Sequence, residues 1–152
     1  AKLQAGEADA TFLAAAGLAR LGESGVGTRL NPEDWLPAPA QAAIGIECRA
    51  DDTGTRELLA AIDHPPSRAE VLAERALLAA LGGNCHSPIA ALSRSEGGRI
   101  TLSAAIYSPD GAERIAAEDS FPAADEAAPA RLAGRLLASA PDSVTAHFSG
   151  PA

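Results

Sequence analysis

The sequence is poor in aromatic residues, in lysine and in cysteine. Its 152 residues include one Trp, one Tyr and three Phe, although 47% of the chain is hydrophobic. Much of that hydrophobic fraction is alanine, so each buried position removes little apolar area from water. We therefore expect the core to depend on Leu, Ile and Val.

Long apolar runs and a basic surface are missing as well. No apolar run approaches eighteen residues, and the N-terminus lacks the basic and apolar regions of a signal peptide. The formal net charge of -8 is opposite to the positive footprint that nucleic-acid binding requires. We expect a soluble cytoplasmic protein with no membrane partner and no nucleic-acid partner.

Cysteine and histidine do not form a metal-ligand pattern. The two cysteines, Cys48 and Cys85, lie far apart, and the three histidines are scattered along the chain. The sequence therefore predicts no metal site. We interpret Cys48 as a small buried hydrophobic residue.

The first 50 residues alternate short apolar segments with glycine and proline. We expect a helix end over 2–7, a short buried strand over 11–15, and a helical turn over 17–22 that ends at glycine. A connector over 22–39 and a small-residue strand over 41–49 follow. Arg20 lies at the end of a strand-turn-helix unit, where α/β proteins place ligand-binding groups, although a solvated helix-end arginine fits equally well.

Two further helices are indicated before the middle of the chain. Asp51 and Asp52 can cap a helix over 55–62, which Pro65 and Pro66 follow. Ser67 and Glu70 have the spacing of a capping box at the start of a helix over 67–81, and the glycines at 82 and 83 can form its left-handed end.

The remainder predicts a small antiparallel sheet. Strands are expected over 88–93, 99–108 and 113–121, joined by glycine turns and followed by a helix over 125–140. The fold class is therefore α+β: residues 67–152 form a three-stranded antiparallel sheet with helices on one face. Residues 51–66 form a helical linker, and residues 1–50 are a strand, helix, connector and strand.

The segment 81–89 (LGGNCHSPI) presents Cys85 between a helix and a strand. A helix C-terminus disfavours a thiolate, and the neighbouring side chain of His86 points away in extended backbone. A Cys-His hydrolase is therefore a weak hypothesis. A covalent attachment point and a plain loop thiol both remain open at this stage.

Several motifs, taken in order, resemble the porphobilinogen deaminase (hydroxymethylbilane synthase) family. They are 12–22 (FLAAAGLARLG), 36–49 (LPAPAQAAIGIECR), 73–75 (AER), 81–89 (LGGNCHSPI) and 108–111 (SPDG). The resemblance covers essentially the whole chain. It implies that residues 1–50 are remnants of two α/β domains and that residues 67–152 are the cofactor-carrying C-terminal domain.

The resemblance also implies an activity. Members of this family are cytoplasmic, three-domain transferases of tetrapyrrole and heme biosynthesis, which join porphobilinogen units into hydroxymethylbilane and release ammonia. A dipyrromethane primer is attached through a thioether to the loop cysteine, here Cys85. Arg20 matches an arginine that binds the carboxylates of the growing pyrrole chain, and Leu13, Ala14 and Gln41 match positions that line the same cleft.

The chain departs from the family in two ways. It resembles only the C-terminal part, so the catalytic aspartate and most of the arginines are absent, and Asp9, Asp34, Asp51 and Asp52 occupy turn or cap positions. The resemblance thus implies a monomeric full-length enzyme and a shorter chain that is inactive alone and lacks its cofactor. Exposed apolar edges within residues 1–50 would favour self-association of the shorter chain. The second departure is Ala40-Gln41-Ala42, where the family usually has glycines around the glutamine.

Overall fold

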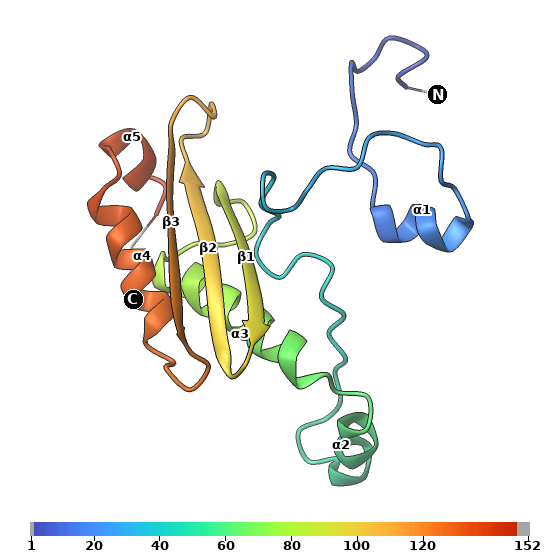
Figure 1. Ribbon diagram of the computed structural model, residues 1–152, viewed down its shortest axis with the longest axis vertical. Helices are drawn as coiled ribbons and strands as arrows, with labels where there is room; N and C mark the ends of the chain where they lie inside the picture. The colour runs from blue at the N-terminus through green and yellow to red at the C-terminus, as the bar shows by residue number, and fades with distance from the viewer. Residues whose placement is uncertain (1, 149–152) are drawn as a thin grey trace. The chain divides into compact units, whose positions relative to one another are not determined.

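The computed structural model describes residues 2–148 (Figure 1). The chain divides into two compact units, Ala1–Asp34 and Trp35–Ala152, called unit 1 and unit 2 below. Each is described by itself. The predicted domain boundaries at 50 and 66 stay a prediction.

Unit 1 contains one helix, α1 (Ala15–Leu21). Gly22 has a φ of 73°, and its N–H donates to the carbonyl of Ala19 while that of Glu23 donates to Leu18, which closes the helix end. The expected helical turn ending at glycine is therefore confirmed.

Two other elements predicted in unit 1 are not observed. Residues 2–7 form turns rather than a helix end, and residues 11–14 precede α1 without forming a strand. The side chain of Phe12 is 75% exposed, so this segment is not buried. A strand needs a neighbouring strand to pair its backbone groups, and residues 2–34 contain none.

Unit 2 begins with an extended segment and α2 (Thr53–Ala60). The carboxylate of Asp52 accepts hydrogen bonds from the N–H of Thr55 at 3.0 Å and from its hydroxyl at 2.9 Å, which confirms the predicted cap. The strand predicted over 41–49 is wrong, because these residues pair with no strand and Ile44 is 88% exposed. Cys48 is also exposed rather than buried.

Helix α3 (Pro65–Ala80) starts earlier than expected. Nδ1 of His64 accepts the N–H of Ser67 at 3.3 Å, so His64 is the N-cap. The predicted capping box is therefore wrong: Ser67 is inside the helix, and the carboxylate of Glu70 accepts a hydrogen bond from Ser95 instead. The left-handed end is confirmed at Gly82, with a φ of 66°.

The sheet contains β1 (Ile89–Glu96), β2 (Arg99–Tyr107) and β3 (Arg114–Pro122) in the order β1-β2-β3, all antiparallel. Gly97 and Gly98 have φ values of 56° and 76°, which two-residue hairpin turns require. Helix α4 (Ala128–Ala138) is shorter than predicted, and the short α5 (Asp142–Thr145) was not expected. The α+β class is confirmed.

The core lies between the sheet and the two long helices. Helices α3 and α4 pack against each other and against the sheet, α3 mainly over β1 and α4 mainly over β3 (Figure 1). Alternate residues of β2 are buried, in keeping with the period of two of a strand. The largest fully buried side chains are Leu77, Leu81, Leu102, Ile106, Leu132, Leu136 and Val144.

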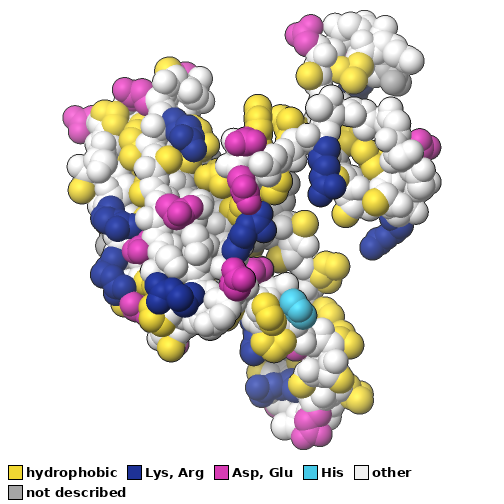
Figure 2. All heavy atoms as spheres, in the orientation of Figure 1, with side chains coloured by type: hydrophobic (Ala, Val, Ile, Leu, Met, Phe, Trp, Pro, Cys, Tyr) yellow, Lys and Arg dark blue, Asp and Glu magenta, His cyan; other side chains and the backbone are white. Residues whose placement is uncertain are grey.

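The surface of the sheet unit carries side chains of both charge signs. Figure 2 shows acidic and basic side chains intermingled over the visible face of the sheet unit, with no continuous basic surface there. Over residues 2–148, no helix has the length and apolar character needed to cross a membrane.

Candidate functional site

The loop between α3 and β1 presents Cys85. The N–H of Asn84 donates to Oγ of Ser87 at 2.9 Å, and the side-chain oxygen of Asn84 accepts the N–H of His86 at 2.9 Å. A third bond joins the N–H of Ser87 to the carbonyl of Asn84 at 3.0 Å. The loop is thus closed by Asn84 and Ser87, and the thiol of Cys85 is exposed.

The two glycines before this loop have distinct roles. Gly82 adopts the left-handed conformation that ends α3. At Gly83 an added Cβ would lie 2.6 Å from Cδ1 of Leu78 and 3.3 Å from Oγ of Ser87, so a side chain there would displace its neighbours. Both glycines therefore define the path of the chain into the loop.

Gln41 lies on a turn that is held from two sides. Its side-chain oxygen accepts the N–H of Ala38 at 3.1 Å, and the N–H of Ala40 donates to Oε2 of Glu74 at 2.6 Å. Ala40 and Ala42 have φ values of 56° and 64°. These are the conformations that glycine adopts most readily, so the glycines usual in the family would fit this backbone without strain.

Glu74 is the polar residue that connects this turn to the sheet. Its side chain is buried, and Oε1 accepts the N–H of Ser93 at 2.8 Å and the Ser93 hydroxyl at 2.7 Å. No motif in the sequence indicated this role of Glu74. The sequence feature that could have indicated a buried Glu74 is its helical spacing, which places it on the same side of α3 as the buried Leu77 and Leu81.

The remaining predicted site residues belong to unit 1. Leu13 is exposed, Ala14 is the N-cap of α1, and Arg20 lies in its last turn. Within residues 2–148, the Arg20 side chain forms no hydrogen bond or ion pair. The five predicted residues are thus divided, three in unit 1 and two (Gln41 and Cys85) in unit 2.

An open hollow of about 880 Å³ lies within unit 2, between the extended segment and the two helices α2 and α3. Ile44 and Ile46 line it from the extended segment, and Arg75 and Leu78 line it from α3. Cys85 does not contribute to it. Among residues 2–148 there is no group of three or more side chains that could hold a metal ion.

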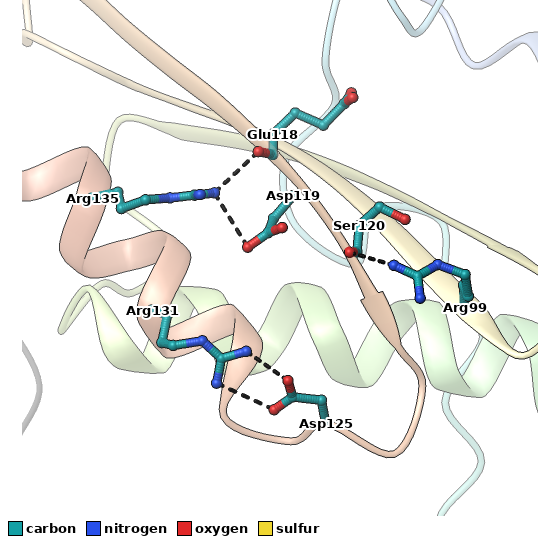
Figure 3. Close-up of polar contacts among 7 residues, drawn as sticks. All are labelled: Arg99, Glu118, Asp119, Ser120, Asp125, Arg131 and Arg135. Carbon is teal, nitrogen blue, oxygen red and sulfur yellow. Dashed lines mark hydrogen bonds and ion pairs between the residues drawn. The ribbon is translucent and has the colours of Figure 1, made fainter.

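Two carboxylates with lowered pKa values, those of Asp110 and Asp125, form hydrogen bonds with neighbouring residues. The Ser108 hydroxyl, with the N–H of Ala112, lowers the pKa of Asp110. The Arg131 guanidinium lowers the pKa of Asp125, which it contacts at 2.6 Å and 3.3 Å (Figure 3). Neither acid is a predicted site residue, and both carboxylates stabilise local structure through these contacts.

Two family models match the chain. One is described as the porphobilinogen deaminase C-terminal domain and matches residues 68–138. The other is described as the porphobilinogen deaminase dipyromethane cofactor binding domain and matches residues 1–57. The chain belongs to the porphobilinogen deaminase family. A dipyrromethane cofactor is therefore a property of this family.

Curated porphobilinogen deaminases align with nearly the whole chain. The protein of Sphingopyxis alaskensis is 53% identical over 98% of the chain and 47% of its own length. Those of Paracoccus denitrificans and Desulforudis audaxviator are 53% and 49% identical, over 84% and 90% of the chain and 41% and 45% of their own lengths. The chain thus spans less than half the length of these deaminases.

The two family matches divide the predicted site. Leu13, Ala14, Arg20 and Gln41 fall within the match to the cofactor binding domain of porphobilinogen deaminase. Cys85 falls within the match to the C-terminal domain. This division differs from that of the compact units, because Gln41 belongs to unit 2.

Proposed function

We propose that this chain is the C-terminal portion of a hydroxymethylbilane synthase and that Cys85 carries the dipyrromethane through a thioether. The observation that supports this most is the exposed thiol at a loop whose hydrogen bonds are formed by Asn84 and Ser87 instead. A substituent on the sulfur of Cys85 would break none of these bonds.

The position of Cys85 suits a tether better than a nucleophile that must remain ionised. It lies in an exposed loop after the C-terminal end of α3. A permanent thioether needs access to the sulfur more than a stable thiolate. When bound, the dipyrromethane supplies the primer to which four porphobilinogen units are added with release of ammonia.

The other predicted residues receive supporting functions. Arg20 binds the carboxylates of the pyrrole chain. Its planar guanidinium group suits bidentate contact with a carboxylate, and within residues 2–148 it forms no hydrogen bond or ion pair. The resemblance to the family assigns Gln41, Leu13 and Ala14 to the binding of the pyrrole chain in the full-length enzyme. The protein acts in cytoplasmic tetrapyrrole and heme biosynthesis, and the full-length enzyme is a monomer.

The chain alone does not turn over porphobilinogen in this proposal. Two of the aspartates in the first part of the chain have structural roles. Asp52 is a helix cap, and Asp34 accepts a hydrogen bond from the side chain of Asn31. The catalytic aspartate would belong to polypeptide outside these 152 residues.

A chimera tests the assignment of Cys85. This chain would replace the matching region of the Sphingopyxis alaskensis deaminase, and porphobilinogen consumption, intact mass and the Ehrlich colour of pyrroles would be measured. The chimera and its Cys48→Ala variant should be active and carry a pyrrole adduct, because Cys48 is the other exposed cysteine of this chain and serves as the control. Cys85→Ala should lose both properties; an active chimera with an unmodified Cys85 contradicts the proposal.

The chain alone provides a second test. We expect a free thiol at Cys85 and no porphobilinogen consumption, because attachment of the dipyrromethane needs the other domains. A pyrrole adduct on the isolated chain would overturn this part of the proposal.

The alternative is a non-catalytic ligand-binding or interaction module in which Cys85 is a plain loop thiol. One observation favours it: the sheet and helices of unit 2 close their own hydrophobic core. A folded chimera with neither adduct nor activity would support this alternative. The thiol hydrolase ranks last, because within residues 2–148 no hydrogen bond joins Cys85 to a histidine.

A further inference from the structure

Glu74 is a buried carboxylate that accepts hydrogen bonds from two separate segments. Its side chain belongs to α3, with a residue exposure of 7%. Oε1 binds the N–H and hydroxyl of Ser93 on β1, and Oε2 binds the N–H of Ala40 in the Gln41 turn at 2.6 Å. One carboxylate thus joins helix, sheet and turn.

The Gln41 turn needs such an external contact. A non-glycine residue in the left-handed conformation costs on the order of 1 kcal/mol, and Ala40 and Ala42 both adopt it. The turn's own hydrogen bonds join Gln41 to Ala38 and Ala43 to Ala40. A hydrogen bond to a carboxylate is stronger than these neutral ones, so Glu74 contributes the largest single contact that opposes relaxation of the turn.

The same helix presents Cys85. Glu74 lies in the middle of α3, whose C-terminal end leads through Gly82 and Gly83 into the Cys85 loop. A rigid helix therefore connects the contact at Ala40 with the position of the thiol.

We propose that Glu74 is a positioning residue that fixes the Gln41 turn relative to the helix that carries Cys85. The hydrogen bonds from Glu74 to Ala40 and Ser93 support the positioning of the turn. Its consequence for substrate binding rests on the proposed function: with the turn released, the groups that line the cleft near Gln41 would no longer be held for the pyrrole chain.

The variant Glu74→Gln distinguishes the hydrogen bond to the turn, at Ala40, from the hydrogen bond to the sheet, at Ser93. The N–H of Ser93 donates to Oε1, and the single hydroxyl hydrogen of Ser93 can turn to Oε1 or to the carbonyl of Glu70, so the amide oxygen of a glutamine is best placed at Oε1. The amide nitrogen, which only donates, then faces the N–H of Ala40. The bond to the turn is lost while the bond to the sheet is kept.

Hydrogen exchange on the 152-residue chain provides the first test. In Glu74→Gln the hydrogen-bonded amides of the turn, those of Ala38, Ala40, Gln41 and Ala43, should exchange about tenfold faster, with exchange in the core strand β2 unchanged. Glu70→Gln is the matched control, because Glu70 lies one turn earlier on α3 and accepts only the N–H of Ser95 through its side chain. Unchanged exchange at 38–43 in a folded Glu74→Gln protein contradicts the proposal.

A second measurement needs no variant. A long-range NMR correlation through the hydrogen bond should connect the amide nitrogen of Ala40 with Cδ of Glu74, as it should for Ser93. A correlation for Ser93 without one for Ala40 would also contradict the contact.

The chimera described above tests the functional consequence. Glu74→Gln should raise the KM for porphobilinogen about tenfold and change kcat less than twofold, whereas Glu70→Gln should change neither. If the unmodified chimera is inactive, the proposed function fails and the exchange and NMR tests still decide the contact. If the chimera is active and Glu74→Gln loosens the turn without changing KM, the positioning role is wrong.

Discussion

The carboxylate of Glu70 accepts a hydrogen bond from the backbone N–H of Ser95 at 2.7 Å, on the outer edge of β1. On the same edge, the N–H of Ser93 donates to Glu74 and that of Ala91 to the carbonyl of Pro37. These are the groups with which another strand would pair.

The opposite edge is covered by cations. Arg135 on α4 donates to the carbonyl of Glu118 at 3.0 Å and pairs with the carboxylate of Asp119, and Arg99 donates to the carbonyl of Ser120 at 2.6 Å (Figure 3). Carboxylates thus cover backbone donors on one edge and guanidinium groups cover backbone acceptors on the other.

Removal of both covers should promote association of sheets. We expect the double variant Glu70→Ala, Arg135→Ala to form dimers or larger species at concentrations where the unmodified chain forms fewer. Sedimentation velocity would measure this. The double variant Arg56→Ala, Glu57→Ala removes the same charges from α2, away from the sheet, and should behave as the unmodified chain; equal association of both variants would exclude the edges as the cause.

The two left-handed alanines predict a gain in stability. Ala40→Gly and Ala42→Gly should each increase the free energy of unfolding by up to about 1 kcal/mol, because glycine removes the strain of a positive φ. Urea unfolding followed by circular dichroism would measure the change. Ala43→Gly is the control, since Ala43 is not among the residues with positive φ and should gain nothing.

Replacement of glycine by alanine in unit 2 should lower the free energy of unfolding at some positions and raise it at another. Gly82→Ala and Gly83→Ala should each lower the free energy of unfolding by about 1 kcal/mol, the first through its positive φ and the second through contact with Leu78. Gly134→Ala should raise it by up to about 1 kcal/mol, because Gly134 is inside α4 with nothing within 4 Å of an added Cβ. Thermal unfolding of the three variants would compare them, and destabilisation by Gly134→Ala would contradict this account.

The cap of α2 should depend on pH. The Thr55 N–H and hydroxyl lower the pKa of Asp52 in the folded chain, so its contribution to stability is present above the unfolded value of about 3.9 and is lost as pH falls through the lowered pKa. The Thr55 amide shift should report this loss in an NMR titration. Asp52→Asn keeps a capping side chain that does not titrate, and it should remove the transition at Thr55.

Local signals predicted much of unit 2 correctly. The paired glycines at 97 and 98 and the alternation through Ile100, Leu102 and Ile106 indicated the hairpin and the buried face of β2. Asp52 indicated the start of α2. These features depend on neighbours a few residues away, which a sequence displays directly.

Most of the failures concern residues whose partners are distant in the chain. The apolar runs at 11–15 and 41–49 resemble strands, but no other strand pairs with them in the described residues. Ser67 and Glu70 have capping-box spacing, but His64 caps α3 and Glu70 binds a residue of β1. Local spacing could not decide between these partners.

The sequence by itself determined the family, the α+β class and the cysteine on which the proposed function depends, because each is carried by short ordered motifs. Tertiary structure decided how Glu74 is used. Its hydrogen bonds reach Ala40 and Ser93, 34 and 19 residues away, and the left-handed alanines become informative only beside that contact. A buried carboxylate must find donors wherever the fold brings them, and only the folded chain shows where they lie.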